Sequence, residues 1–215
     1  MQELQLSNHF DNEMGLELSD GFHCKVLDIF STEVSIYLYR NVDNMPEIHR
    51  KLVSKELSCC IVKANLVLEP LHVSTAVDRA VLNQMNGLMF TRNLNTEIIY
   101  YLSASKNILE GIQNFGVSDD TRDVLIIIIY TSEEKEAVTR YILSSIKGER
   151  IPIDRLYEFS DIELMKELYN IDTDELRDVE LEDAIISRIG GYKPKTRQFV
   201  LPMIQNTMIS NDLES

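Results

Sequence analysis

The side chains best suited to metal binding are few in this sequence and far apart. The four histidines are His9, His23, His49 and His72. No two of them have the spacing that puts two ligands on one face of a helix, and none lies in a dense cluster of carboxylates. Because a zinc site needs three or four converging ligands, we interpret all four as surface or partly buried histidines. The sequence predicts no metal site and no cofactor.

The three cysteines, Cys24, Cys59 and Cys60, do not form a metal or redox motif. Adjacent Cys59 and Cys60 lack the two-residue spacer of zinc-binding pairs and of C-x-x-C redox sites, so we interpret them as small core residues. Three cysteines do not make an even disulfide framework, which fits a reducing compartment.

Sequence motifs for phosphate binding or nucleophilic catalysis do not occur. The chain contains no G-x-x-x-x-G-K-[ST], G-x-G-x-x-G or G-x-S-x-G pattern. Carboxylates are plentiful at residues 119–123 and 133–136, but these two stretches are predicted to be a loop and a helix start, where acidic side chains are solvated or favour the helix dipole. Nothing in the pattern calls for an acid–base pair, so the sequence predicts no catalytic residue.

Length and charge limit the classes of protein that fit. The chain has 215 residues, 44% hydrophobic and 26% charged, which suits one sizeable globular core. Its net charge of −14 disfavours a protein that wraps nucleic acid unaided, and also binding to an anionic membrane. It does suit a basic protein partner. No apolar run is long enough to span a membrane, and the acidic N-terminus lacks a secretory signal, so we expect an intracellular protein.

The centre of the chain, residues 91–130, predicts the unit on which the other elements pack. Two short apolar runs, residues 97–102 and 124–130, are rich in Ile, Val and Tyr, which indicates buried strands. The segment between them has apolar residues at helical spacing, with Asn107 placed to cap its start and Gly116 to end it. The sequence thus predicts strand, helix, strand, with a right-handed crossover if the two strands are parallel.

The flanking elements are predicted from the same signals. Residues 24–30 and 34–39 predict an antiparallel hairpin, while residues 58–62 fit either a short strand or a buried connection. Helices are predicted at residues 46–56, 70–86, 132–148 with Ser132 as its cap, 161–169 and 178–189, and one or two helical turns at 151–157.

Together these elements predict a single α+β domain, with a small mixed sheet of four or five strands surrounded by helices. We expect the domain to occupy residues 21–190. Residues 1–20 are polar and acidic, which is typical of a mobile tail. Residues 191–215 have no helical or strand periodicity, so we expect a flexible C-terminal extension.

The last predicted helix, residues 178–189, has an apolar arc wider than one packing partner needs. Two interpretations stay open. The helix is wedged between the sheet and the C-terminal extension, or part of the arc binds a partner protein with Arg188 as a charged anchor. We expect Ile185 to face the core of the chain itself. The arc combines a stripe of Leu181, Ala184, Ile185, Arg188 and Ile189 with Val179 and Ile186 on another side.

A polar stretch, residues 91–97, precedes the first central run. The favoured interpretation is a loop whose side chains bond its own backbone. The functional alternative is a contact patch for a nucleic acid or peptide, with Arg92 and Lys106 supplying positive charge. A rival class is a small enzyme or ligand-binding domain with a pocket near Thr96 and Glu97.

The same stretch carries a resemblance to a known family. The run TRNLNTEII at residues 91–99, followed by Leu102-Ser103, Asn107-Ile108 and the FGV of residues 115–117, resembles the TPRKB family, the kinase-binding subunits of the KEOPS (EKC) complex. Residues 183–189 resemble the C-terminal helix of that family. The resemblance extends in register from about Lys25 to Ile189.

The resemblance implies a non-enzymatic subunit that binds the small atypical kinase/ATPase of KEOPS through its C-terminal helix. The assembled complex, whose ligase chemistry belongs to another subunit, helps attach threonylcarbamoyl to the adenosine beside the tRNA anticodon. The resemblance also implies contact with the tRNA acceptor end, a link to telomere maintenance, and a location in cytoplasm and nucleus. The expected kinase-binding residues are Leu181, Ala184, Ile185, Ile186, Arg188 and Ile189. The expected tRNA-binding residues are Arg92 and Lys106, with Lys193, Lys195 and Arg197 as outside candidates.

Overall fold

The structure, a computed structural model, describes residues 20–26 and 32–191. The tail and the C-terminal extension expected at residues 1–20 and 191–215 therefore fall almost wholly outside the described residues. Among the described helices, none is both long and apolar enough to cross a membrane.

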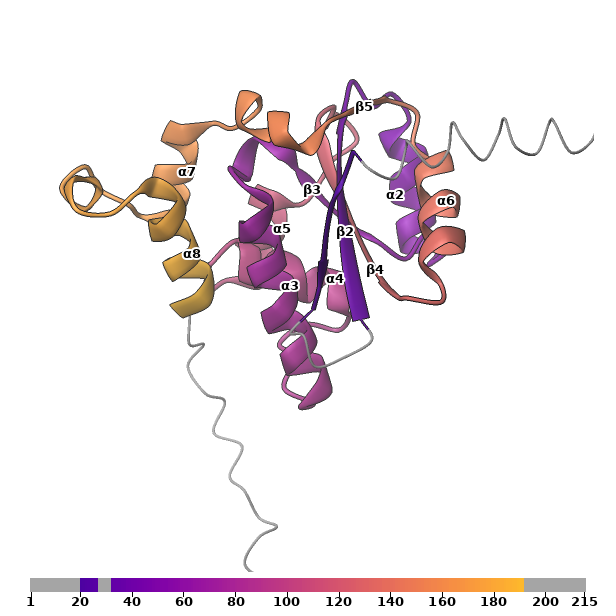
Figure 1. Ribbon diagram of the computed structural model, residues 1–215, viewed down its shortest axis with the longest axis horizontal. Coiled ribbons are helices and arrows are strands. Elements are labelled where there is room, and N and C mark those ends of the chain that lie inside the picture. Colours follow the sequence, from indigo (N-terminus) through magenta and orange to yellow (C-terminus); the bar gives the residue numbers. More distant parts are fainter. Residues whose placement is uncertain (1–19, 27–31, 192–215) are drawn as a thin grey trace, which may run out of the picture.

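Five strands form one sheet in the centre of the molecule (Figure 1). They run in the order β1-β2-β4-β3, and β5 pairs with β2 beside β1. Every pairing between these strands is antiparallel, so the prediction of a mixed sheet is wrong in that respect, although the α+β class and strand number are confirmed. Their bounds are β1 Phe22–Lys25, β2 Thr32–Arg40, β3 Cys60–Lys63, β4 Val124–Thr131 and β5 Glu149–Ile151.

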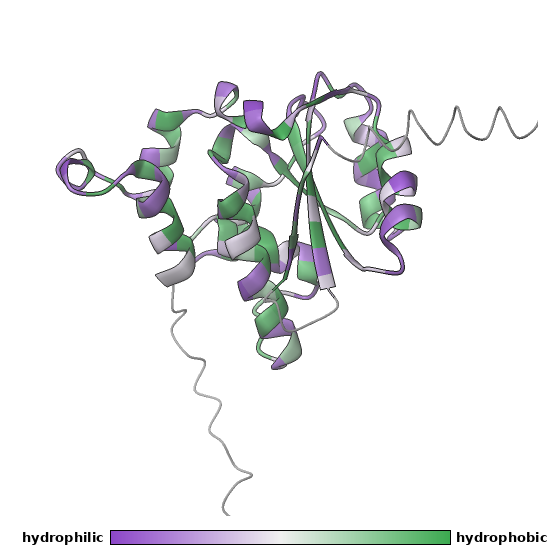
Figure 2. Cartoon of the chain, in the orientation of Figure 1, coloured by the Kyte–Doolittle hydropathy of each residue, from purple (hydrophilic) through white to green (hydrophobic). Residues whose placement is uncertain are grey.

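Helices cover both faces of this sheet (Figure 1). One face is covered by α2 and α6, and the other by α3, α4 and α5, with α7 and α8 further out. Figure 2 shows hydrophobic residues concentrated in the sheet and on the helix sides that face it. The helices are α2 Met45–Val53, α3 Pro70–Met85, α4 Leu94–Leu102, α5 Ile108–Phe115, α6 Lys135–Ser144, α7 Ile162–Tyr169 and α8 Leu181–Gly191, with 3₁₀ turns η1 Ala64–Leu66, η2 Ile153–Glu158 and η3 Glu175–Arg177.

Strand β2 shows why the sheet needs two helical layers. Its side chains alternate between the two faces, as in any strand. Ile36 and Leu38 enter the core under α3 and α4, whereas Tyr37 and Tyr39 enter the second core under α2 and α6. All four are buried, so neither face of the strand is left to solvent.

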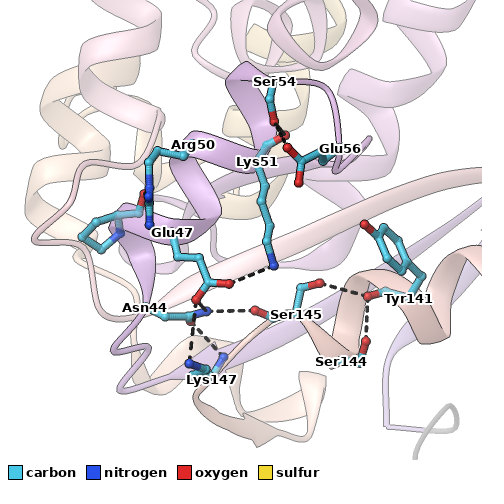
Figure 3. Close-up of polar contacts among 11 residues, drawn as sticks. Asn44, Glu47, Arg50, Lys51, Ser54, Glu56, Tyr141, Ser144, Ser145 and Lys147 are labelled. Carbon is cyan, nitrogen blue, oxygen red and sulfur yellow. Dashed lines mark hydrogen bonds and ion pairs between the residues drawn. The ribbon is translucent and has the colours of Figure 1, made fainter.

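Asn44 ties the two helices of the smaller layer together (Figure 3). Its side-chain amide donates to the Ser145 carbonyl at 2.9 Å, and its Oδ1 accepts from the Lys147 backbone N–H at 2.9 Å. Glu47, in the first turn of α2, pairs with Lys51 at 2.8 Å, and the pKa of its carboxyl is lowered chiefly by that pair. The start of α2 is thereby fixed against the chain that leaves α6.

The run at residues 97–102 is a helix, α4, and not the predicted strand. Asn93 caps it by accepting the Thr96 backbone N–H at 2.9 Å. The error has a physical cause, because a short run that is apolar on all sides fits a buried helix as well as a buried strand. The central unit is therefore helix, helix, strand, and the predicted crossover between parallel strands does not exist. The capping of α5 by Asn107 and the strand at β4 are confirmed.

The remaining predictions hold with shifted ends. The hairpin pairing is confirmed as β1 with β2, although β1 starts earlier than expected, and residues 27–31 between them lie outside the described part. Residues 58–62 resolve as strand β3, and Ile151 ends strand β5 before the helical turn η2. Ser132 does not cap α6. Its hydroxyl donates to Glu33, and the helix starts three residues later.

Candidate functional site

Helix α8, the expected kinase-binding element, packs alongside α3 in the same direction. At its start the Glu182 carbonyl lies 3.3 Å from Nε2 of His72, and at its end the Gly190 carbonyl accepts from Arg79. The contacts advance from 72 to 79 on one helix and from 182 to 190 on the other, so the two helices are parallel. Long-range contacts to α3, and not neighbours in sequence, therefore set the position of α8.

His72 is the buried side chain that holds the first turn of α8. It has no exposed surface, and burial lowers its pKa to about 4, so the ring is neutral near pH 7. The Nε2–H donates to the Glu182 carbonyl, while Nδ1 has no partner among the described residues. Neither sequence spacing nor charge identified this histidine as a helix-to-helix contact.

The expected kinase-binding residues divide into two groups. Ala184, Ile185 and Ile189 are at most 1% exposed and belong to the main core. The expectation that Ile185 faces the chain's own core is confirmed. These three side chains fix α8 to the domain and offer no surface in this structure.

The outward group consists of the three partly exposed residues, Leu181, Ile186 and Arg188. Leu181 and Arg188 share one side of the helix, where Leu181 packs at the edge of the core, and Ile186 lies on another side. Arg188 makes two bonds to the Glu175 carboxylate, at 2.6 and 2.5 Å. Glu175 raises the pKa of Arg188, and Arg188 in turn lowers that of Glu175. The guanidinium is therefore held in place before any partner arrives, beside the exposed side chains of α8.

An acidic surface surrounds this outward group. Between residues 172 and 183 the chain has seven Asp or Glu residues and one Arg. Val179, just before α8, is 40% exposed and adds apolar area. Exposed apolar side chains within an acidic rim are suited to a protein partner whose complementary surface is basic.

The polar stretch before α4 bonds to itself, as the favoured interpretation predicted. Glu97 has no exposed surface. Its carboxylate accepts from the Phe90 backbone N–H at 3.1 Å, from the Thr91 backbone N–H at 2.8 Å and from the Thr91 hydroxyl at 2.7 Å. Together with the Asn93 cap, these bonds hold the loop against the start of α4 and leave Arg92 exposed.

Arg92 and Lys106 are both exposed but are not neighbours. Arg92 precedes α4 and Lys106 follows it, and a nine-residue helix is about 13 Å long. The two cations thus lie near opposite ends of α4 and could contact separate phosphates, not one. Lys193, Lys195 and Arg197 lie outside the described residues.

A hollow of about 610 Å³ lies beside the start of α4. Asn93, Asn95 and Thr96 line one part of it with polar groups. Leu52 and Val53 from the end of α2 line the apolar part. Val53 is 75% exposed.

The side chains around this hollow are poorly suited to catalysis or metal binding. Thr96 lines it, as the rival hypothesis predicted, but Glu97 does not. Cys59 also lines it, and burial raises the pKa of its thiol to about 12, so it stays protonated. His49 lies on the rim, 3.4 Å from Asp119. Over residues 20–26 and 32–191, no three His, Cys, Asp or Glu side chains come together as metal ligands would.

Comparison with known proteins agrees with the fold and these surfaces. The family profile "Kinase binding protein CGI-121" matches residues 39–191. The chain is 31% identical over 164 residues to the EKC/KEOPS complex subunit cgi121 of Aspergillus fumigatus, covering 74% of this chain and 87% of the relative. It is 30% identical over 157 residues to the EKC/KEOPS complex subunit TPRKB of Danio rerio, covering 73% and 89%.

A third relative is the EKC/KEOPS complex subunit CGI121 of Eremothecium gossypii, with 31% identity over 146 residues, 65% of this chain and 80% of the relative. The profile match begins within β2 and ends with α8, so it contains both surfaces described above. The chain belongs to the CGI-121 family of kinase-binding proteins, which includes the TPRKB subunits.

Proposed function

We propose that this protein is a non-catalytic subunit of a KEOPS/EKC complex and binds the small atypical kinase/ATPase of that complex. The observation that carries the proposal is the family match, because it covers nearly the whole described domain. By the same family relation, we propose that it supports threonylcarbamoyladenosine formation in tRNA, has a role in telomere maintenance, and is located in cytoplasm and nucleus.

For the kinase-binding surface, we propose the outward side of α8, centred on Ile186. Ile186 is a partly exposed apolar residue one helical turn after Glu182 and Asp183 of the acidic rim, and its side chain is available for burial in an interface. The buried Ala184, Ile185 and Ile189 act indirectly by holding α8 in position. Apolar residues near the centre of an interface contribute most of its binding energy.

Co-purification with the kinase tests this surface. We expect Ile186→Glu to weaken kinase binding by about 2–4 kcal/mol, roughly 30- to 1000-fold, because a charge would be buried without a partner. Leu109→Glu is the matched control, since Leu109 is a 62% exposed apolar residue on α5 and should leave binding unchanged. If folded Ile186→Glu retains the kinase fully, the outward side of α8 is not the interface.

A second contact, with tRNA, is proposed for Arg92 and Lys106. Both cations are exposed, and Asn93, Asn95 and Thr96 supply hydrogen-bonding groups in the hollow next to Arg92. A hollow of about 610 Å³ is within the usual size of small-molecule sites, so it could receive one or two nucleotides from the end of the tRNA chain. The acidic chain should bind tRNA weakly by itself, so the complex is the object to measure.

Binding of tRNA by the whole complex tests this second contact. We expect Arg92→Ala to reduce the affinity and to reduce the slope of log K against log salt by roughly 0.7–0.9, the value for one phosphate contact. Arg140→Ala is the control, because Arg140 is an exposed cation on α6, on the other side of the sheet. An unchanged affinity and slope for Arg92→Ala would remove this residue from the tRNA site.

A further inference from the structure

Three apolar side chains are exposed together at the C-terminal end of α3. We call Leu82, Met85 and Leu88 the α3-end patch; their exposed fractions are 48%, 52% and 62%. Leu82 and Met85 are three residues apart and share one side of the helix. Gly87 has a φ of +66°, and the Leu88 backbone N–H donates to the Asn83 carbonyl at 2.8 Å. This helix-ending turn brings Leu88 back beside the last helical residues.

A hollow of about 430 Å³ adjoins the α3-end patch. Val81, Met85, Leu94 and Ile129 supply its apolar lining, and Glu134 lies at its side. Single exposed apolar residues are common on protein surfaces, but a group of them beside an apolar hollow marks a site that another segment covers.

The end of α8 points the chain toward this patch. The Gly190 carbonyl accepts from Arg79, and α8 runs parallel to α3. Leu82 lies almost one turn beyond Arg79, and Met85 lies about 9 Å beyond it along the helix axis. Space beside Gly190 and Gly191 is open, because an added Cβ would meet no atom within 4 Å.

The segment that follows Gly191 has the composition and length to reach the patch. It contains an apolar run at residues 199–204, of sequence FVLPMI. The eight residues from Gly191 to Phe199 can span up to about 26–29 Å when extended. That reach is about three times the roughly 9 Å that separate Arg79 from Met85 along the axis of α3.

Charge also favours this segment over other occupants. Lys193, Lys195 and Arg197 precede the apolar run, and no acidic residue occurs between 192 and 211. The chain as a whole has a net charge of −14, and the hollow has Glu134 at its side. The basic residues would therefore be attracted to the domain that they leave.

We propose that residues 199–204 fold back onto the α3-end patch of the same chain and cover it. A patch of three side chains is too small for a stable dimer, which buries at least about 1,200 Å² in total. A tethered segment needs much weaker contacts, because a short linker holds it at an effective concentration in the millimolar range. The proposal does not depend on the kinase or tRNA contacts proposed above.

Tryptophan fluorescence of the full chain tests the proposal, because the protein contains no tryptophan. Phe199→Trp introduces a single emitter. We expect emission at shorter wavelength and weaker iodide quenching than for tryptophan in unfolded protein. Adding Met85→Lys should return both values toward those of exposed tryptophan, whereas adding Val179→Lys, at another exposed apolar residue, should change neither.

Three outcomes would overturn the proposal. Emission of a fully exposed tryptophan in Phe199→Trp itself would show that the segment does not dock. An emission shift that survives Met85→Lys in folded protein would place the segment elsewhere. A shift that grows with protein concentration over a 100-fold range would assign the contact to a second copy. As a second measurement, Leu201→Asp in the full chain should accelerate amide hydrogen exchange at residues 82–88 if the segment covers them.

Discussion

Glu97 is a carboxylate without solvent contact, and the donors to it come from the loop just before its own helix. Two backbone N–H groups and one hydroxyl point at its oxygens. A buried carboxylate is tolerated only when such donors replace water. Glu97 therefore holds the loop that precedes α4, and that carries Arg92, in one conformation.

Replacing the Glu97 carboxylate by an amide is a small chemical change, but it should reduce the stability of the fold clearly. We expect Glu97→Gln to lower the free energy of unfolding by about 2–3 kcal/mol, because the amide NH2 would face N–H donors in a buried site. Urea denaturation measures the change. Glu163→Gln, an exposed glutamate on α7, should cost less than about 0.5 kcal/mol. Equal effects of the two substitutions would contradict the role given to Glu97.

At the residue scale, the sequence predicted backbone signals better than contacts between distant residues. Asn107 caps α5 and Pro70 begins α3, because both act on neighbours within one turn. Ser132 failed as a cap because a partner 99 residues away, Glu33, takes its hydroxyl. The same limit applies to His72, whose partner lies on α8.

Among the helices, the parallel pair of α3 and α8 positions the proposed kinase-binding surface. His72 links the first turns of α3 and α8, and its ring is neutral in the folded protein near pH 7. The pKa of His72 is about 4 in the folded protein, against 6.5 in the unfolded chain. Between these pH values the unfolded chain binds the proton and the folded protein does not. Stability from this residue is therefore fully present above pH 6.5 and is lost as the pH falls toward 4.

The helix pair should therefore loosen in mild acid. We expect wild type to lose up to about 3 kcal/mol of stability between pH 7 and pH 4 through His72, and His72→Gln to lack this loss. Urea denaturation at several pH values measures the difference between the two proteins. Surface carboxylates titrate in both proteins, so their effect on stability cancels when the two pH curves are compared. Parallel pH curves would show that His72 does not contribute.

The error at α4 shows what limits prediction of whole elements. Ile98, Tyr101 and Leu102 are buried at helical spacing, but Glu97 and Tyr100 are buried as well. A run buried on all sides has no periodicity, so only Asn93, with its side chain on the Thr96 N–H, distinguishes the helix. The apolar arc of α8 is wide because Ala184, Ile185 and Ile189 are buried in the core, while Leu181 and Ile186 are apolar but partly exposed.

The whole molecule separates its candidate surfaces. The outward side of α8 is acidic and apolar, whereas the start of α4 combines Arg92 with a hollow that is partly polar and partly apolar. Kinase and tRNA could therefore bind together, as the proposed function requires. The sequence predicted a pocket near Thr96 but not its other walls, because α2, β3 and α5 also contribute to it. The α+β class was predictable, since it depends on the number and type of elements.

The central pairing of the sheet also has a consequence for how the protein is made. β4 contains four consecutive isoleucines, and Ile127 pairs with Ile36, about 90 residues earlier in the chain. During synthesis β2 is left without its main partner until most of the domain has left the ribosome. We therefore expect slow folding, with the isoleucine strand exposed to aggregation until β2 and β3 enclose it.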